Sequence, residues 1–219
     1  MLSRAAVTHG DRVLVTGASG GVGSAAVQLA AARGATVTAV AAPGKHAQLQ
    51  SLGAARAVDR GTIAESCGVD SFDVVIDVVG GNEWPTLLDV LRAGGRYAVA
   101  GAIAGPIVEL DLRTLYLKDQ RLLGCTVLDD GVFASLVRRI ESGAVRPVVA
   151  ATFALEQIVA AYRLTEAECI GYLAQLEPPP PALASFRAAR AARVAAAGGA
   201  SCTLADRKST RLNSSHRCL

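Results

Sequence analysis

The stretch VLVTGASGGVG, residues 13–23, decides the fold class of this 219-residue chain. Its aliphatic run ends at Thr16, and small residues follow. A second aliphatic segment, residues 36–40, comes after Gly34. Between the two, apolar residues at helical spacing predict a helix whose buried face consists of Val22, Ala26, Leu29 and Ala30. Strand, glycine-rich turn, helix and strand in this order predict the first βαβ unit of a dinucleotide-binding sheet.

The glycines of this turn predict a pyrophosphate-binding site. Without a Cβ, Gly20 allows a tight turn with a pyrophosphate against the backbone, and Gly23 allows the helix to pack close to the strand. The unpaired N–H groups at the helix start would then face the phosphates. Glycine-rich turns also occur for steric reasons alone, but the flanking strands and helix favour cofactor binding. The predicted pyrophosphate-binding residues are Ala18, Ser19, Gly20, Gly21, Val22 and Gly23.

Further alternating segments complete an open sheet. Helices are expected over residues 46–52, 84–91 and 132–142. Strands are expected around residues 57–58, over the nearly continuous apolar run 72–79, over 96–100 after the helix-breaking pair Gly94-Gly95, and over 122–127. The pattern predicts an α/β fold of the Rossmann type: a doubly wound, mostly parallel six-stranded sheet with helices on both faces. Ligands of such sheets bind beyond the carboxyl ends of the strands.

The composition suits this fold. Hydrophobic residues make up 51% of the chain and aromatic residues only 4%, so the core consists of small aliphatic side chains. No apolar run approaches the roughly 20 residues that span a bilayer, so we expect no membrane partner. There is no signal-peptide pattern, and five cysteines without a CxxC pair indicate neither a disulfide framework nor a zinc ribbon. Reduced thiols favour a cytoplasmic protein.

The chain is expected to comprise three segments. Residues 1–146 would form the dinucleotide-binding domain, residues 147–170 a strand–turn–helix remnant of another domain, and residues 171–219 a disordered or non-native tail. The tail contains DRKSTRLNSSH, residues 206–216, which looks like a translated sequencing adapter. It also holds seven basic and two acidic residues, which leaves 15 basic and 17 acidic residues elsewhere. The net charge of +3 therefore indicates no nucleic-acid-binding surface.

Two dehydrogenase families share this type of glycine motif. Read as TGxxxGxG from Thr16, it resembles the short-chain dehydrogenases, but no tyrosine of the chain has the required lysine four residues later. Read as AxGxxG from Ala18, it resembles the medium-chain dehydrogenase/reductases, especially their quinone-oxidoreductase branch. Four later segments also resemble the second family: LGAARAVD (52–59), FDVVIDVVGG (72–81), GGRYAVAG (94–101) and SGAVRPVVAATFALEQIVAAY (142–162).

This resemblance implies the cofactor-binding domain of an NADP(H)-dependent oxidoreductase. Such enzymes transfer hydride to or from a quinone, enone, aldehyde or alcohol, so the full-length parent would act on a small molecule. In the family a catalytic domain precedes the segment that begins here at Met1, and CIGY (169–172) stands where HIGK is usual. We therefore expect an inactive fragment, with any zinc ligands upstream. The alternatives are a stand-alone NADP(H)-binding module without turnover and a fragment without function.

The residues after the second predicted strand favour NADP over NAD. NAD-preferring sites place an acidic residue there, whereas AAPG, residues 41–44, contains none. The resemblance implies that Lys45 binds the 2′-phosphate and that Arg60 lies where the family often has a tyrosine near the same phosphate. Two cations near one phosphate favour NADP. The alternative is that both are ordinary solvated surface charges.

The resemblance also implies the remaining cofactor contacts. Val79 and Gly80 would line the adenosine ribose. The nicotinamide carboxamide would be held by the backbone of Gly101, Ala102 and Ile103 and by that of Val127 and Leu128. The predicted sixth strand, residues 122–127, lies at a sheet edge in relatives and is a candidate for pairing in a homodimer.

The sequence predicts neither a catalytic residue nor a metal site. The three histidines have no cysteine or carboxylate partner at ligand spacing. Cys125 is expected to be a buried structural thiol in a strand, and Cys67 to end a helix or lie in a loop. Asp77 would either cap a turn or line the cofactor cleft. The three histidines without such a partner are His9, His46 and His216.

Overall fold

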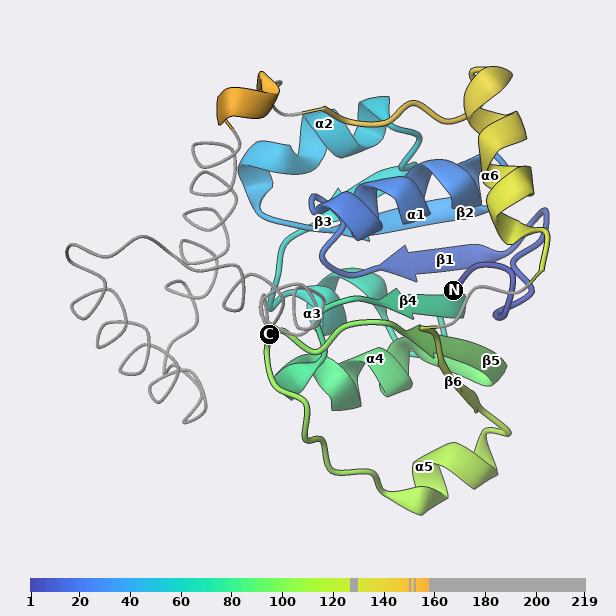
Figure 1. Ribbon diagram of the computed structural model, residues 1–219. Helices are drawn as coiled ribbons and strands as arrows, with labels where there is room; N and C mark the ends of the chain where they lie inside the picture. Colours follow the sequence, from blue (N-terminus) through green and yellow to red (C-terminus); the bar gives the residue numbers. More distant parts are fainter. Residues whose placement is uncertain (127–129, 150, 152, 158–219) are drawn as a thin grey trace, which may run out of the picture. The chain divides into compact units, whose positions relative to one another are not determined.

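A computed structural model describes residues 1–126, 130–149, 151 and 153–157 (Figure 1). The chain divides into two compact units. The first comprises Met1–Ala102 and Pro106–Ala150, and the second comprises Ile103–Gly105 and Ala151–Leu219. The expected tail, residues 171–219, lies outside the described residues, and the three segment boundaries drawn from the sequence stay predictions.

The first unit contains the whole sheet. Its strands are β1 (Arg12–Val15), β2 (Thr36–Val40), β3 (Arg56–Val58), β4 (Phe72–Asp77), β5 (Leu91–Val99) and β6 (Arg121–Gly124). Its α-helices are α1 (Gly21–Ala31), α2 (His46–Ser51), α3 (Ile63–Cys67), α4 (Trp84–Val90), α5 (Leu112–Leu117) and α6 (Val132–Glu141). Two 3₁₀ turns, η1 (Pro43–Lys45) and η2 (Gly81–Glu83), precede α2 and α4, and a third, η3 (Leu155–Gln157), belongs to the second unit.

The six strands form one sheet in the order β3-β2-β1-β4-β5-β6. The fold class predicted from the sequence is confirmed, and every neighbouring pair is parallel. Successive strands are added on one side of β1 up to β3, and on the other side from β4 onward (Figure 1). Ligands of such sheets bind at this switch point, outside the carboxyl ends of β1 and β4.

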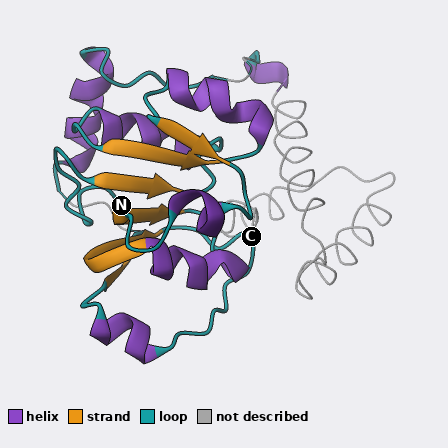
Figure 2. Ribbon diagram, turned by 180° about the vertical axis from the view of Figure 1, so that it is seen from behind, coloured by secondary structure: helices purple, strands orange, loops and turns teal. Residues whose placement is uncertain are grey.

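Helices cover both faces of the sheet, which explains why β4 is apolar along most of its length and buried throughout (Figure 2). On one face, residues of α1 pack on alternate residues of the central strands, such as Val13 and Val15 of β1. On the other face, residues of α3 and α4 pack on the intervening positions, such as Leu14 and Val75. The alternation of side chains along each strand supplies both layers of the core.

The structure corrects the predicted start of the fifth strand. We expected Gly94-Gly95 to break a helix before a strand at Arg96, but α4 ends at Val90 and β5 begins at Leu91. Phe72 pairs with Leu91 and Val74 with Arg96, so a bulge lies between the two pairs. Gly94 has φ +70°, and a Cβ on Gly95 would lie 2.6 Å from Leu91 Cγ. The two glycines therefore accommodate a bulge inside the strand.

Other predicted elements also differ. The sixth strand is Arg121–Gly124 rather than residues 122–127, and Val127 lies outside the described residues. The strand expected from residue 147 is absent from residues 147–149. Helices α3 and α5 were not predicted. In α5 the large apolar residues Leu112, Tyr116 and Leu117 are 61–72% exposed, so burial did not produce a readable periodicity.

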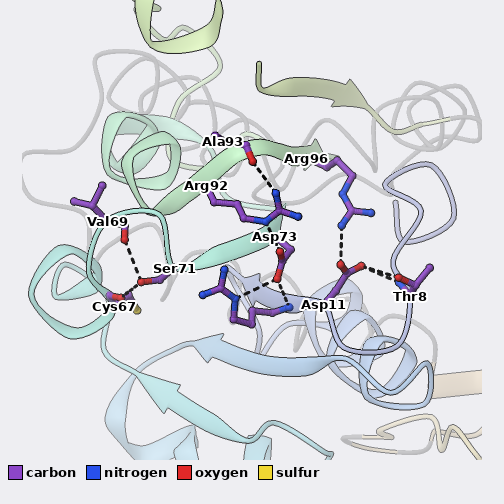
Figure 3. Close-up of polar contacts among 10 residues, drawn as sticks. Thr8, Asp11, Cys67, Val69, Ser71, Asp73, Arg92, Ala93 and Arg96 are labelled. Carbon is purple, nitrogen blue, oxygen red and sulfur yellow. Dashed lines mark hydrogen bonds and ion pairs between the residues drawn. The ribbon is translucent and has the colours of Figure 1, made fainter. Parts of the chain in front are cut away.

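Ion pairs close the amino ends of the central strands (Figure 3). The carboxylate of Asp73 accepts hydrogen bonds from the backbone N–H of Arg12 at 2.7 Å, from Arg12 Nε at 3.2 Å and from Arg92 Nε. Burial disfavours the charged carboxylate, but these hydrogen bonds outweigh burial and lower the pKa of Asp73. Arg96 Nη2 donates to Asp11 Oδ1 at 2.8 Å beside them. The polar contacts at this end stabilise the sheet, and they lie opposite to the carboxyl ends of the strands, where ligands of such sheets bind.

Candidate cofactor-binding site

The turn after β1 depends on a glycine that the sequence analysis did not single out. Gly17 has φ +55°, in the left-handed region. A Cβ on it would lie 2.8 Å from Val78 Cγ2 and 2.9 Å from Val79 Cγ2. The backbone N–H of Gly20 donates to Gly17 O at 3.0 Å and closes the turn. Gly17 therefore lets the chain turn sharply against the loop that follows β4.

Gly23 and Gly20 have different roles. A Cβ on Gly23 would lie 2.1 Å from Gly17 O and 2.7 Å from Ala18 Cα, so the helix needs glycine there to pack on the turn. A Cβ on Gly20 would lie 3.4 Å from Gly17 O, and one on Gly21 would have nothing within 4 Å. The fold therefore tolerates side chains at Gly20 and Gly21. Their absence leaves bare backbone at the start of α1.

This helix start has the chemistry of an anion site. Gly20 is the N-cap and offers no side-chain cap hydrogen bond, and the first turn holds no acidic residue. The first amides of a helix have no partner within the helix and carry its positive dipole end.

Val22 is 59% exposed, so its predicted place on the buried face is wrong. The α1 residues that are buried in the core are Ala26, Val27 and Ala30, and the partly buried Leu29 packs against them as predicted.

A buried carboxylate joins the loops that follow β1 and β4. Asp77 is fully buried, and its Oδ1 accepts hydrogen bonds from Thr16 Oγ1 at 2.5 Å, from the N–H of Val79 at 2.8 Å and from that of Gly80 at 3.1 Å. Of the two roles considered for Asp77, the structure supports the cap: its carboxylate holds the turn Val79–Gly80 and does not face solvent.

Tyr97 of β5 completes this cluster. Its hydroxyl donates to Asp77 Oδ2, and its ring packs edge-to-face on Trp84, with ring centroids 4.8 Å apart. Burial and the neighbouring Asp77 carboxylate raise the pKa of the Tyr97 phenol. The hydroxyl therefore stays protonated and acts as a donor. The strands β1, β4 and β5 are in this way fixed to one another just below the loops at their carboxyl ends.

The loop after β5 packs on the loop that follows β4. A Cβ on Gly101 would lie 2.4 Å from Val78 O, so close approach of the two loops requires glycine. Gly101 and the half-buried Ala102 thus lie beside the turn that holds Val79 and Gly80. Ile103 belongs to the second unit, so the structure does not place it at this site. Val127 and Leu128 lie outside the described residues.

The predicted phosphate-binding cations lie beyond β2 and β3. Lys45 ends η1, Arg60 follows β3, and both are exposed. Next to them, His46 Nε2 lies 3.1 Å from Asp59 Oδ1 and 3.3 Å from the carbonyl oxygen of Ala41. The contact between His46 and Asp59 brings the two cation-bearing loops together.

Sequence reasoning missed this pair. It predicted only that His46 has no carboxylate partner at metal-ligand spacing, and it considered an acidic residue for the ribose only directly after β2. Because β3 pairs with β2 in parallel, residues that directly follow β3 reach the same edge of the sheet. The dipeptide Asp59-Arg60 immediately after β3 was the signal that could have revealed the contact. Among the described residues, no group of three His, Cys, Asp or Glu side chains could hold a metal ion.

Comparisons with known proteins agree with this geometry. The family model of zinc-binding dehydrogenases matches residues 21–142. An acryloyl-coenzyme A reductase from Metallosphaera sedula is 35% identical over 74% of this chain and 49% of its own length. A crystal structure of a provisionally named alcohol dehydrogenase from Sinorhizobium meliloti 1021 is 47% identical, with a TM-score of 0.70, over 76% of this chain and 48% of that one.

A third match is the structure of a crotonyl-CoA carboxylase/reductase in complex with NADP. It is 25% identical, with a TM-score of 0.66, over 74% of this chain and 48% of that one. Other curated relatives include quinone oxidoreductases. The chain spans about half the length of the first of these curated relatives. It belongs to the zinc-binding dehydrogenases of the medium-chain dehydrogenase/reductase family and comprises the cofactor-binding region of that family.

Proposed function

We propose that this chain binds NADP(H) and presents its nicotinamide for hydride transfer to or from a quinone, enone, aldehyde or alcohol. The observation that carries the proposal is the start of α1. Its N-cap has no side-chain partner, and nothing lies within 4 Å of where a Gly21 side chain would begin. Bare amides at the switch point of a parallel sheet are suited to a pyrophosphate.

Each part of the cofactor is assigned to a different part of the backbone. The pyrophosphate would lie on the backbone from Ser19 to Gly23, with Ala18 buried behind it. The adenosine ribose would lie against Val79 and Gly80. The family resemblance assigns the carboxamide to the backbone of Gly101, Ala102, Ile103, Val127 and Leu128. When bound, the nicotinamide supplies the hydride chemistry, and the protein supplies position and electrostatics.

We propose NADP rather than NAD as the preferred cofactor. Residues 41–44 contain no acidic side chain, and Lys45 and Arg60 place two cations on neighbouring loops. One structural relative, the crotonyl-CoA carboxylase/reductase, has been solved with NADP. A 2′-phosphate carries close to two negative charges and forms strong charge-assisted hydrogen bonds with lysine and arginine.

Turnover would require more than this region. Because the chain spans about half of its relatives' length, we propose that the groups that bind the substrate lie elsewhere in a longer protein. The described residues do not fit a zinc ion, so no zinc-dependent step is assigned to them.

None of the described helices is long and apolar enough to cross a bilayer. The free thiols of Cys67 and Cys125 fit a cytoplasmic location.

We also propose that β6 pairs with its counterpart in a second copy. It pairs with β5 alone in the sheet, and Leu122 on it is 36% exposed. A strand at the edge of a sheet presents unpaired backbone groups to a second chain.

Cofactor binding is tested by separate titrations with NADPH and NADH. Trp84, the only tryptophan, is buried at the start of α4 beside Tyr97, and energy transfer from it to a bound nicotinamide gives one signal. The fluorescence of the reduced nicotinamide itself gives a second. Saturable binding with NADPH tighter than NADH supports the proposal. Absence of saturable change in both signals refutes cofactor binding, and tighter NADH binding refutes the NADP preference.

A further inference from the structure

The imidazole of His46 lies across the carboxyl ends of β2 and β3. Its Nε2 atom is 3.1 Å from Asp59 Oδ1 and 3.3 Å from the carbonyl oxygen of Ala41, the residue that follows β2. The N–H of Ala41 donates to Val58 O at 3.1 Å, so the two strands are paired up to their ends. A carboxylate and an imidazole thus meet at the carboxyl-terminal end of the sheet, where dinucleotide-binding folds bind the adenosine ribose.

The negative charge of Asp59 disfavours the binding of a 2′-phosphate nearby. Its side chain is 43% exposed, although its Oδ1 atom is shielded from solvent and accepts no well-aligned hydrogen bond among the described residues. A carboxylate at this edge normally accepts ribose hydroxyls and repels a phosphate. The exposed cations Lys45, which precedes His46, and Arg60, which follows Asp59, favour the phosphate. The cofactor preference therefore depends on whether the charge of Asp59 reaches the cofactor.

We infer that His46 masks the carboxylate of Asp59 and so lets the neighbouring cations accept the 2′-phosphate. This inference rests on the proposed function and assigns the cofactor preference to a pair that sequence reasoning did not identify. His46 acts through Asp59 and is a positioning residue, because its Nε2 atom faces the carboxylate and the Ala41 carbonyl. Without the imidazole, Asp59 is free to turn toward the ribose, where it repels a phosphate and accepts hydroxyls.

A purely structural role makes a different prediction. If the contact only attaches α2 to the end of β3, its loss changes the affinities for NADPH and NADH by the same factor. If His46 instead binds the phosphate directly, its loss weakens NADPH binding whether or not Asp59 is charged. The comparison of the two cofactors separates the structural case, and a double-mutant cycle separates direct phosphate binding, in which the effect of His46 does not depend on Asp59.

The test uses the full chain and four proteins: wild type, His46→Ala, Asp59→Asn and the double variant. Each is titrated with NADPH and with NADH. His46→Ala is expected to weaken NADPH binding roughly three- to tenfold, as for the loss of a partly exposed charge interaction, and to leave NADH binding within about twofold. Asp59→Asn is expected not to weaken NADPH binding. The double variant is expected to bind NADPH within about twofold of wild type.

Gln48→Ala, an exposed change on the same helix, is the matched control and is expected to alter neither affinity. Thermal melts verify that all variants fold. Equal shifts for the two cofactors, or failure of Asp59→Asn to restore NADPH binding in the double variant, overturn the inference and leave the proposed function in place. A wild-type chain that binds neither cofactor overturns both.

Discussion

The hydroxyl of Thr16 at the end of β1 donates to the carboxylate of Asp77 at the end of β4, with 2.5 Å between the two oxygens. The same hydroxyl accepts a hydrogen bond from the N–H of Val78 at 3.1 Å. One side chain thus connects the two strands between which the cofactor is expected to lie. The distance between the two loops is therefore set by two buried side chains.

Thr16→Val removes this connection while keeping the shape of the side chain. The Asp77 carboxylate loses a donor and the N–H of Val78 loses its acceptor, both in the interior. We expect the free energy of unfolding to fall by about 1–3 kcal/mol, the usual cost of leaving buried polar groups unpaired. Denaturant titration measures it. Thr36→Val at the exposed start of β2 is the control, and an equal loss in both variants would contradict the assigned role.

The glycines of the first turn are expected to differ in their tolerance of alanine. Gly23→Ala places a Cβ 2.1 Å from Gly17 O, and we expect severe destabilisation or failure to fold. Gly21→Ala meets nothing within 4 Å and gains roughly 0.5–1 kcal/mol of helix propensity. Thermal melts of the two variants compare them directly. Similar melting temperatures for Gly23→Ala and wild type would disprove the close approach of helix and turn.

Asp73 makes stability depend on pH at the acidic end. Its pKa is lowered in the folded state, so its contribution is fully present above the unfolded-state pKa of about 3.9 and is lost as the pH falls through the lower folded-state value. We expect Asp73→Asn to be less stable than wild type at neutral pH and to lose less stability on acidification. Urea titrations at several pH values measure this difference. Parallel pH profiles for the two proteins would count against the role of the ion pairs with Arg12 and Arg92.

Pairing through β6 is expected to be sensitive to charge. Leu122→Lys adds a cation to the exposed edge strand, which disfavours association with a second copy. Size-exclusion chromatography with light scattering should show a dimer for the wild type and a smaller species for the variant. Ile107→Lys, at an 87% exposed position outside the sheet, is the control. A wild-type chain that is monomeric at all concentrations would rule out this contact.

The elements that could be predicted are those whose pattern is dictated by burial. β4 is buried on both faces, and its apolar sequence follows directly from that. The turn between β1 and α1 was located by its glycines. The bulge in β5 was not predicted, because the pair Gly94-Gly95 has the same local composition whether it ends a helix or forms a bulge in a strand. α5 was missed because its apolar residues face outward, so its sequence has no buried stripe.

The candidate site likewise contains residues that local sequence predicts and contacts that it does not predict. Ser19 to Gly23 could be proposed from the sequence because all these residues lie in one short segment. The partners of Asp77 come from the residue that follows β1 and from β5 as well as from its own loop, and the partner of His46 directly follows β3. Such contacts depend on strand order and register, which local spacing does not contain. Knowing that β2 and β3 are parallel neighbours would have been enough to consider Asp59.

The most direct test of the central claim, that bare amides at the start of α1 hold a pyrophosphate, is NADPH binding by Gly21→Asp. The new side chain has open space, and a carboxylate at a helix N-terminus is favourable, so the melting temperature should be unchanged or higher. The same charge would face the pyrophosphate, so we expect NADPH affinity to fall by roughly tenfold or more. Ala32→Val, at the exposed far end of the helix, should bind NADPH as the wild type does. A stable Gly21→Asp protein with wild-type NADPH affinity would contradict the account.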